Sequence, residues 1–191
     1  LRCVGNAEPH CDRMQHCISV GVVGPSNAPM LPEKRRFRTR KEPVPLGSAG
    51  EYDRIMCARY TMTLPVDALS KLYGLTRLAD VEPRFNIAPS QRVPAVRLDP
   101  DGEGELALLQ WGLVPGWAKD ISIGAKLFNA RSETVAEKPS FRNAFRKCRC
   151  LMPADGFYEW QLLDGRKQPV YVRLIGGEPF AFASLWETWR S

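Results

Sequence analysis

The chain has only two histidines, no Cys-x-x-Cys motif and no long apolar run, and each of these absences excludes a class of protein. None of its six cysteines forms a Cys-x-x-Cys pair. The candidate zinc ligands Cys3, His10, Cys11, His16 and Cys17 match no usual finger spacing, so we expect no metal and no other cofactor. No apolar run approaches the roughly 18 residues of a membrane span, and no secretory signal is evident. We therefore expect a cytoplasmic protein.

The length, composition and charge of the chain indicate how it folds and what kind of partner it binds. The 191 residues are 44% hydrophobic and 25% charged, which is typical of one folded domain rather than a disordered chain. The net charge is +6. An excess of basic side chains favours an anionic partner such as nucleic acid, without requiring one. The sequence also contains no glycine-rich phosphate loop and no internal repeat.

Residues 1–55 differ in character from the rest. The stretch 26–50 contains four prolines and the basic run KRRFRTRK, and no helical or strand period persists there. We interpret 1–55 as a disordered tail or as translated upstream sequence, in which case Met56 is the first residue. A basic arm that binds nucleic acid is an alternative. The folded domain is then expected over 56–191.

From residue 56 the pattern predicts short helices and extended runs. A helix is expected over 63–73, where Pro65 suits the first turn and Gly74 the end, and partial helix is expected over 132–145. Hairpin signals at 164–165 and 176–177 separate the later runs and predict an antiparallel meander, hence an α+β fold. Because the last run ends almost at Ser191, we expect the domain to be truncated at its C-terminus. The extended runs are 106–114, 148–163, 168–175 and 179–187.

Cys57 follows Met56, and this pair suggests an unusual nucleophile. If translation starts at Met56, methionine aminopeptidase removes it because Cys is small, and Cys57 then carries a free amine beside its thiol. The two groups have pKa values of about 8 and about 8.5, so both are partly unprotonated at neutral pH. The amine can form a Schiff base with an aldehyde, and the sulfur can close a five-membered thiazolidine. The alternative is a buried cysteine without a chemical role.

Three later segments contain further candidates. In NARSE, Asn129 can hold an amine or a carbonyl and Arg131 can bind a phosphate, or the segment simply caps a helix. In FYEWQ, aromatic neighbours favour a raised pKa for Glu159 that suits proton transfer, or Glu159 is an ordinary edge-strand carboxylate. In WGLVPGW, Trp117 can stack on a base, whereas Trp111 fits a core position.

Six motifs then combine into a family resemblance. In order, they are MCARY, PRFNIAPSQ, WGLVPGWAKD, NARSETVAEKPSFR, CLMPADGFYEW and PFAFASLWE. Over Met56–Glu187 the chain resembles the SOS-response-associated peptidase (SRAP) family of abasic-site processing proteins. The resemblance implies one α+β domain with a central antiparallel, barrel-like β-sheet and short flanking helices, and a monomer without cofactors. It also implies that the mature N-terminal cysteine forms a thiazolidine crosslink with an abasic site in single-stranded DNA, which protects the lesion in the DNA-damage response.

The same resemblance implies roles for eight residues. The group expected to carry the chemistry consists of Cys57 as nucleophile, Asn129 as the residue that positions its amine, and Glu159 as acid/base. The group expected to bind DNA consists of Arg59, Asn86, Pro89, Trp117 and Arg131. Such a protein would be nucleoid-associated when bound to DNA.

The chain departs from the family pattern in three places. Ala58 replaces a glycine, a family active-site histidine is expected only beyond Ser191, and Cys57 is internal in the chain as written. An internal Cys57 has no free amine, so this chemistry requires that the residues before Cys57 be absent. A start at Met56 is a simpler explanation than removal of a propeptide of 55 residues. Two alternative functions stay open. They are a thiol autopeptidase or hydrolase that uses Cys57, and a module that binds single-stranded nucleic acid noncovalently.

Overall fold

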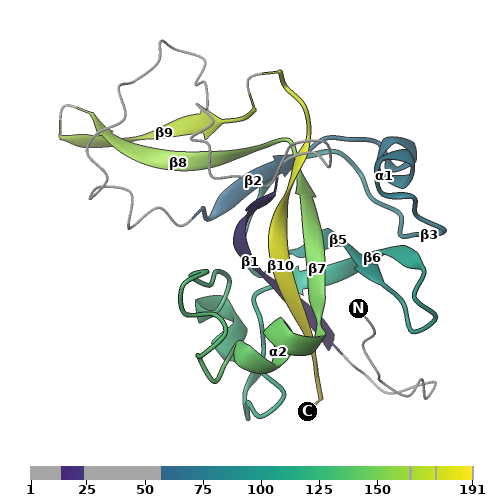
Figure 1. Cartoon of the computed structure of the whole chain (residues 1–191). Helices are drawn as coiled ribbons and strands as arrows, with labels where there is room; N and C mark the ends of the chain where they lie inside the picture. The colour runs from purple at the N-terminus through teal and green to yellow at the C-terminus, as the bar shows by residue number, and fades with distance from the viewer. Residues whose placement is uncertain (1–13, 24–56, 164, 175, 191) are drawn as a thin grey trace.

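The computed structural model describes residues 14–23 and 57–190, apart from 164 and 175 (Figure 1). Two β-sheets and short helices make up this part of the chain. None of its helices is long and apolar enough to cross a membrane. The helices are α1 (Val66–Tyr73), a 3-10 helix (Ile121–Lys126) and α2 (Arg142–Lys147). The strands are β1 (Met14–Val23), β2 (Arg59–Met62), β3 (Arg77–Leu78), β4 (Arg84–Ile87), β5 (Arg92–Leu98), β6 (Gly104–Trp111), β7 (Arg149–Ala154), β8 (Gly156–Leu163), β9 (Arg166–Val172) and β10 (Phe180–Trp189).

The larger sheet closes on itself. Its strand order is β1-β10-β7-β5-β6-β3, and β1 also pairs with β6 in parallel, which joins β1, β10, β7, β5 and β6 into a barrel. The second sheet has the order β4-β2-β8-β9, and its β8–β9 hairpin extends away from the barrel (Figure 1). The α+β fold with a barrel-like sheet and short helices is thus confirmed.

β1 lies inside the region that the sequence suggested to be a disordered tail or upstream sequence, and for residues 14–23 the expectation of disorder is wrong. The strand pairs with β10 from Met14 opposite Trp189 to Val23 opposite Ala181. Cys17 and Ile18 are fully buried. The stretch CISVGVV is too short for a signal peptide, but its β-branched residues suit one buried strand. The basic run and the other candidate zinc ligands Cys3, His10 and Cys11 lie outside the described residues.

The later elements confirm some predicted boundaries and correct others. α1 follows Pro65 and ends at Gly74, whose φ of 62° is left-handed, so this helix is confirmed. The β8–β9 hairpin is also confirmed. The predicted single run 148–163 is two strands divided at Asp155, and the regular helix within 132–145 begins only at Arg142. The predicted antiparallel meander is wrong at β10, which pairs with β7 and β1 rather than with β9. The reason is that the chain turns at Asp155, which places β7 and β8 in different sheets.

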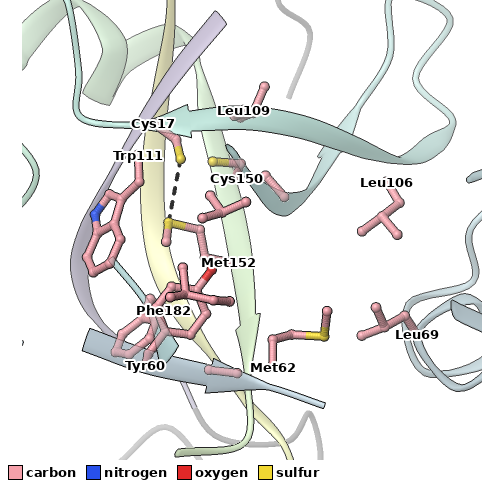
Figure 2. Packing of buried hydrophobic residues seen from close by; sticks show 14 of the residues in the cluster. Cys17, Tyr60, Met62, Leu69, Leu106, Leu109, Trp111, Cys150, Met152 and Phe182 are labelled. Carbon is pink, nitrogen blue, oxygen red and sulfur yellow. Dashed lines mark hydrogen bonds between the residues drawn. The ribbon is translucent and has the colours of Figure 1, made fainter. Parts of the chain in front are cut away.

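The barrel core is built around Tyr60, which packs edge-on against two other aromatic rings (Figure 2). The ring centroids of Trp111 and Phe182 lie 5.4 Å and 5.6 Å from that of Tyr60. On the β1 side, Cys17 Sγ lies 3.6 Å from Met152 Sδ. β1 therefore contributes directly to the main core. A second cluster consists of Ile18, Leu113, Val135, Phe141, Ala144 and Leu185.

If β1 is part of the barrel, truncating its buried side chains must destabilise the whole domain. We expect Ile18→Ala in the full chain to lower the free energy of unfolding by about 2–5 kcal/mol, because it leaves a cavity in the second cluster. Chemical denaturation followed by tryptophan fluorescence measures this change. Leu162→Ala is the control, since Leu162 is 67% exposed and its loss should cost under about 0.5 kcal/mol. Equal stability of the two variants would show that β1 is not docked.

Candidate functional site

Cys57 lies directly before β2, and a hydrogen bond from Asn129 fixes its backbone. Asn129 Nδ2 donates to the carbonyl oxygen of Cys57 at 2.7 Å. The segment that contains Asn129 is itself held, because Trp111 Nε1 donates to the carbonyl of Phe128 at 2.7 Å. Asn129 also forms a parallel bridge with Ser19 of β1. The position of Cys57 thus depends on the barrel core through a short chain of hydrogen bonds.

Glu159 on β8 meets the side chain of Cys57. The Cys57 thiol is hydrogen-bonded to the Glu159 carboxyl group. Burial raises the pKa of the Cys57 thiol well above its ordinary value, and the hydrogen bond and the charge of Glu159 raise it further. Burial also raises the pKa of Glu159, in the direction expected from its aromatic neighbours. At neutral pH the thiol therefore keeps its proton, with a proton-accepting group beside it.

One oxygen of the Glu159 carboxyl group, Oε1, is buried and has no hydrogen-bond partner among the described residues. A buried carboxyl oxygen without a partner is costly in an otherwise well-bonded interior. This oxygen can accept from or donate to a bound molecule while the other side of the carboxyl group contacts Cys57.

The carboxylate of Asp155 holds β2 and β8 in register. It accepts hydrogen bonds from the hydroxyl groups of Thr61 and Thr63, and its Oδ2 also accepts from the Thr63 backbone N–H at 2.6 Å. The Thr61 hydroxyl lies 2.8 Å from the Tyr171 hydroxyl of β9. Gly156 leaves room for this ring, since a Cβ there would lie 2.2 Å from the Tyr171 side chain. The network fixes β2, which follows Cys57, against β8, which carries Glu159.

Arg59 and Asn86 form a second hydrogen-bonded pair, next in sequence to the Cys57 group. Arg59 Nη1 donates to Asn86 Oδ1 at 3.0 Å, between neighbouring strands β2 and β4. Pro89 lies in the turn after β4, next to Ser90, whose N–H donates to the carbonyl of Trp111 at 2.7 Å. Asn86 is exposed and Arg59 is partly buried. Together they present a guanidinium group and an amide near the surface, which are groups suited to a phosphate backbone.

Trp117 and Arg131 lie on exposed loops. The side chain of Trp117 is 61% exposed, whereas Trp111 is buried as the sequence suggested. The Trp117 loop is anchored at both ends, by Gly112 N–H donating to the carbonyl of Cys17 at 2.7 Å and by Trp189 Nε1 donating to the carbonyl of Ala118 at 2.8 Å. An exposed ring on an anchored loop can stack on a base.

The replacement of the family's glycine by Ala58 does not strain the backbone. Among the described non-glycine residues only Ser90 has a positive φ, so Ala58 occupies a region that any residue adopts. Within the described ranges no group of three or more His, Cys, Asp and Glu side chains is placed to hold a metal ion.

The structure thus joins Cys57, Asn129 and Glu159 in one hydrogen-bonded group. Arg59 and Asn86 form a second pair. Pro89, Trp117 and Arg131 lie on loops, and their side chains make no hydrogen bond to either group within the described part of the chain. Sequence reasoning missed four residues that support the site, because each acts on a partner far along the chain: Ser19, Thr61, Thr63 and Asp155.

Known proteins resemble this chain in sequence. The chain is 41% identical over 138 residues to the abasic site processing protein YoaM of Bacillus subtilis (strain 168), with 70% of this chain and 60% of that protein covered. It is 32% identical over 172 residues to the abasic site processing protein HMCES of Pongo abelii, with 71% of this chain and 49% of that protein covered. The chain thus spans about half to three fifths of the length of these relatives.

Solved structures match the fold. A crystal structure of a protein from Bacteroides thetaiotaomicron has a TM-score of 0.61 and 25% identity, with 70% of this chain and 61% of that chain covered. A second, from Bordetella bronchiseptica, has a TM-score of 0.59 and 26% identity, with 70% and 69% covered. The family model described as SOS response associated peptidase (SRAP) matches residues 56–191. Since that match spans well over half of the chain, the protein belongs to the SRAP family.

Proposed function

We propose that this protein captures abasic sites in single-stranded DNA by forming a thiazolidine through an N-terminal Cys57. The observation that carries the proposal is the group in which Asn129 fixes the backbone of Cys57 while Glu159 contacts its thiol. Relatives that are named abasic site processing proteins support the choice of substrate. The reaction requires a free α-amine on Cys57, so it requires that no peptide bond joins Met56 to Cys57.

The first step opens the sugar. An abasic deoxyribose is in equilibrium with an open-chain aldehyde, and opening breaks the bond between C1′ and the ring oxygen. Glu159 in its protonated form donates a proton to that oxygen, and the C1′ hydroxyl loses its proton to water as the aldehyde forms. The raised pKa of Glu159 keeps the carboxyl group protonated at a higher pH than an exposed carboxyl would be.

The next steps join protein and DNA. The Cys57 amine attacks the aldehyde carbon and water leaves, which gives an imine. The sulfur then attacks the same carbon, the thiol proton passes through Glu159, now a carboxylate, to the nitrogen, and the thiazolidine ring closes. The sum is amine plus thiol plus aldehyde to thiazolidine plus water. Asn129 contributes by holding Cys57, which makes the second bond formation intramolecular and well oriented.

The groups around this centre are suited to a single strand. Arg59 and Arg131 supply positive charge for phosphates, Asn86 bonds Arg59 from β4, and Pro89 lies in the turn after β4. Trp117 offers an exposed ring on which a base next to the lesion can stack. These contacts would position the strand so that the abasic sugar meets Cys57.

Covalent capture is tested in the full chain, with residues 51–56 replaced by a protease recognition sequence that leaves Cys57 as the new N-terminus. After cleavage, verified by mass spectrometry, the protein should form a heat-stable adduct with abasic single-stranded DNA on a denaturing gel. The uncleaved protein should form none, because it lacks the amine. Cleaved Cys57→Ser should lose the stable adduct, because a hydroxyl group is a much weaker nucleophile than a thiol. An equally stable adduct with Cys57→Ser would rule out the thiazolidine.

The pH dependence of the crosslinking rate reports on Glu159. As the pH rises, the unprotonated fraction of the amine grows while the protonated fraction of Glu159 falls, so the rate should pass through a maximum. Glu159→Gln cannot donate a proton, and its rate should be about a hundredfold lower and should reach a plateau at high pH. The rate is measured by single-turnover crosslinking from pH 5 to 10. A wild-type maximum retained in Glu159→Gln would assign the proton donor elsewhere.

The salt dependence of noncovalent binding tests Arg131. Each phosphate contact contributes about 0.7 to the slope of log affinity against log salt for a single strand. We expect Arg131→Ala to reduce this slope by about that amount in fluorescence anisotropy with undamaged single-stranded DNA. Arg77→Ala is the matched control, because the Arg77 guanidinium already pairs with Asp99 at 3.0 Å. Equal slopes for Arg131→Ala and the wild type would remove Arg131 from the DNA contact.

A further inference from the structure

β1 does more than complete the barrel, because one of its residues contacts the segment that holds Cys57. Ser19 meets the 128–130 segment through its backbone and its side chain. Its N–H donates to the carbonyl of Phe128 at 3.4 Å, and its carbonyl accepts from the N–H of Ala130 at 2.9 Å. Its hydroxyl donates to Asn129 Oδ1 at 3.1 Å. Ser19 therefore contacts Asn129, the residue that binds Cys57, and both of its chain neighbours.

The geometry of β1 changes at this residue. The pairing with β10 runs without interruption from Met14 to Ser19, but it shifts by one residue between Ser19 and Gly21. Such bulges redirect a side chain or end a pairing, and they are common next to functional sites. Here the bulge coincides with the point at which Ser19 bridges to Asn129. The irregularity of β1 thus lies where the strand contacts the site.

The hydroxyl of Ser19 also holds the second end of the Asn129 amide. An asparagine side chain has one accepting and one donating end. The Cys57 carbonyl can only accept, so it fixes the direction of the amide, and Nδ2 donates to it at 2.7 Å. Ser19 donates to the opposite end, Oδ1, and so anchors the amide from the β1 side.

We propose that Ser19 of β1 is a positioning residue that holds Asn129, and thereby Cys57, in place. The role rests on the function proposed above only for its effect on crosslinking, since the hydrogen bond to the amide can be tested without DNA. It also makes the active site depend on a strand that lies ahead of Cys57 in the chain. When the chain is cut before Cys57, β1 must stay docked in the barrel for the site to keep its geometry.

The hydrogen bond from Ser19 is tested in the uncleaved full chain by NMR of asparagine side-chain amides labelled with nitrogen-15. The Asn129 resonance is identified by its loss in Asn129→Asp. Ser19→Ala should speed solvent exchange of the Asn129 amide about three- to tenfold, the effect of losing one hydrogen bond, and Ser19→Thr should restore it. Val20→Ala is the matched control, because Val20 packs on the second cluster from the same strand without touching Asn129 by a hydrogen bond. Unchanged exchange in Ser19→Ala, or the same increase in Val20→Ala, would overturn the proposal.

The consequence for chemistry is tested in the same variants after cleavage before Cys57. At saturating abasic DNA, Ser19→Ala should lower the first-order crosslinking rate about three- to tenfold and leave the dissociation constant for undamaged single strands unchanged. Ser19→Thr should restore the rate. An unchanged rate in Ser19→Ala would overturn the positioning role. If the cleaved wild type forms no adduct, the proposed function fails, while the amide exchange still decides the role of Ser19.

Discussion

Two hydrogen bonds on one side-chain amide join three parts of the chain that are far apart in sequence. Asn129 accepts from Ser19 of β1 and donates to the backbone of Cys57, across 110 and 72 positions respectively. The bond from Ser19 depends on the barrel, because β1 is held beside Asn129 by its pairing with β10 and β6. The arrangement of the site is therefore a consequence of barrel closure, and local preferences of the Cys57 segment contribute little to it.

Burial gives the site its electrostatic character. The thiol of Cys57 and the carboxyl group of Glu159 are both partly removed from water, and both have raised pKa values for that reason. The site thus combines a thiol that keeps its proton with a carboxyl group of raised pKa, two groups that can exchange protons with a bound molecule. The Asp155 network holds the strands that carry them by joining β2 to β8 through Thr61 and Thr63. A hydrogen-bonded frame and proton-exchanging groups thus occur side by side.

Much of the fold and of the site could be predicted from local sequence. Pro65 and Gly74 bounded α1, and Trp111 fitted the core. The prediction was wrong where distant partners decided the outcome. Asp155 divides one extended run into β7 and β8 because its carboxylate binds threonines that lie 92 and 94 residues away. β10 joins β7 and β1 for the same reason, since its partners become available only after the chain has turned.

The sequence by itself determined the family through its ordered motifs, the helix and strand types through local propensity, and the candidate thiol, amide and carboxyl groups through their chemistry. Only the tertiary structure decided that residues 14–23 are a barrel strand and that Ser19 reaches Asn129. It alone decided that Cys57 and Glu159 share a buried environment. The physical reason is that propensity and periodicity act over a few residues. Hydrogen bonds, burial and the resulting pKa values depend on which distant segments the closed barrel brings together.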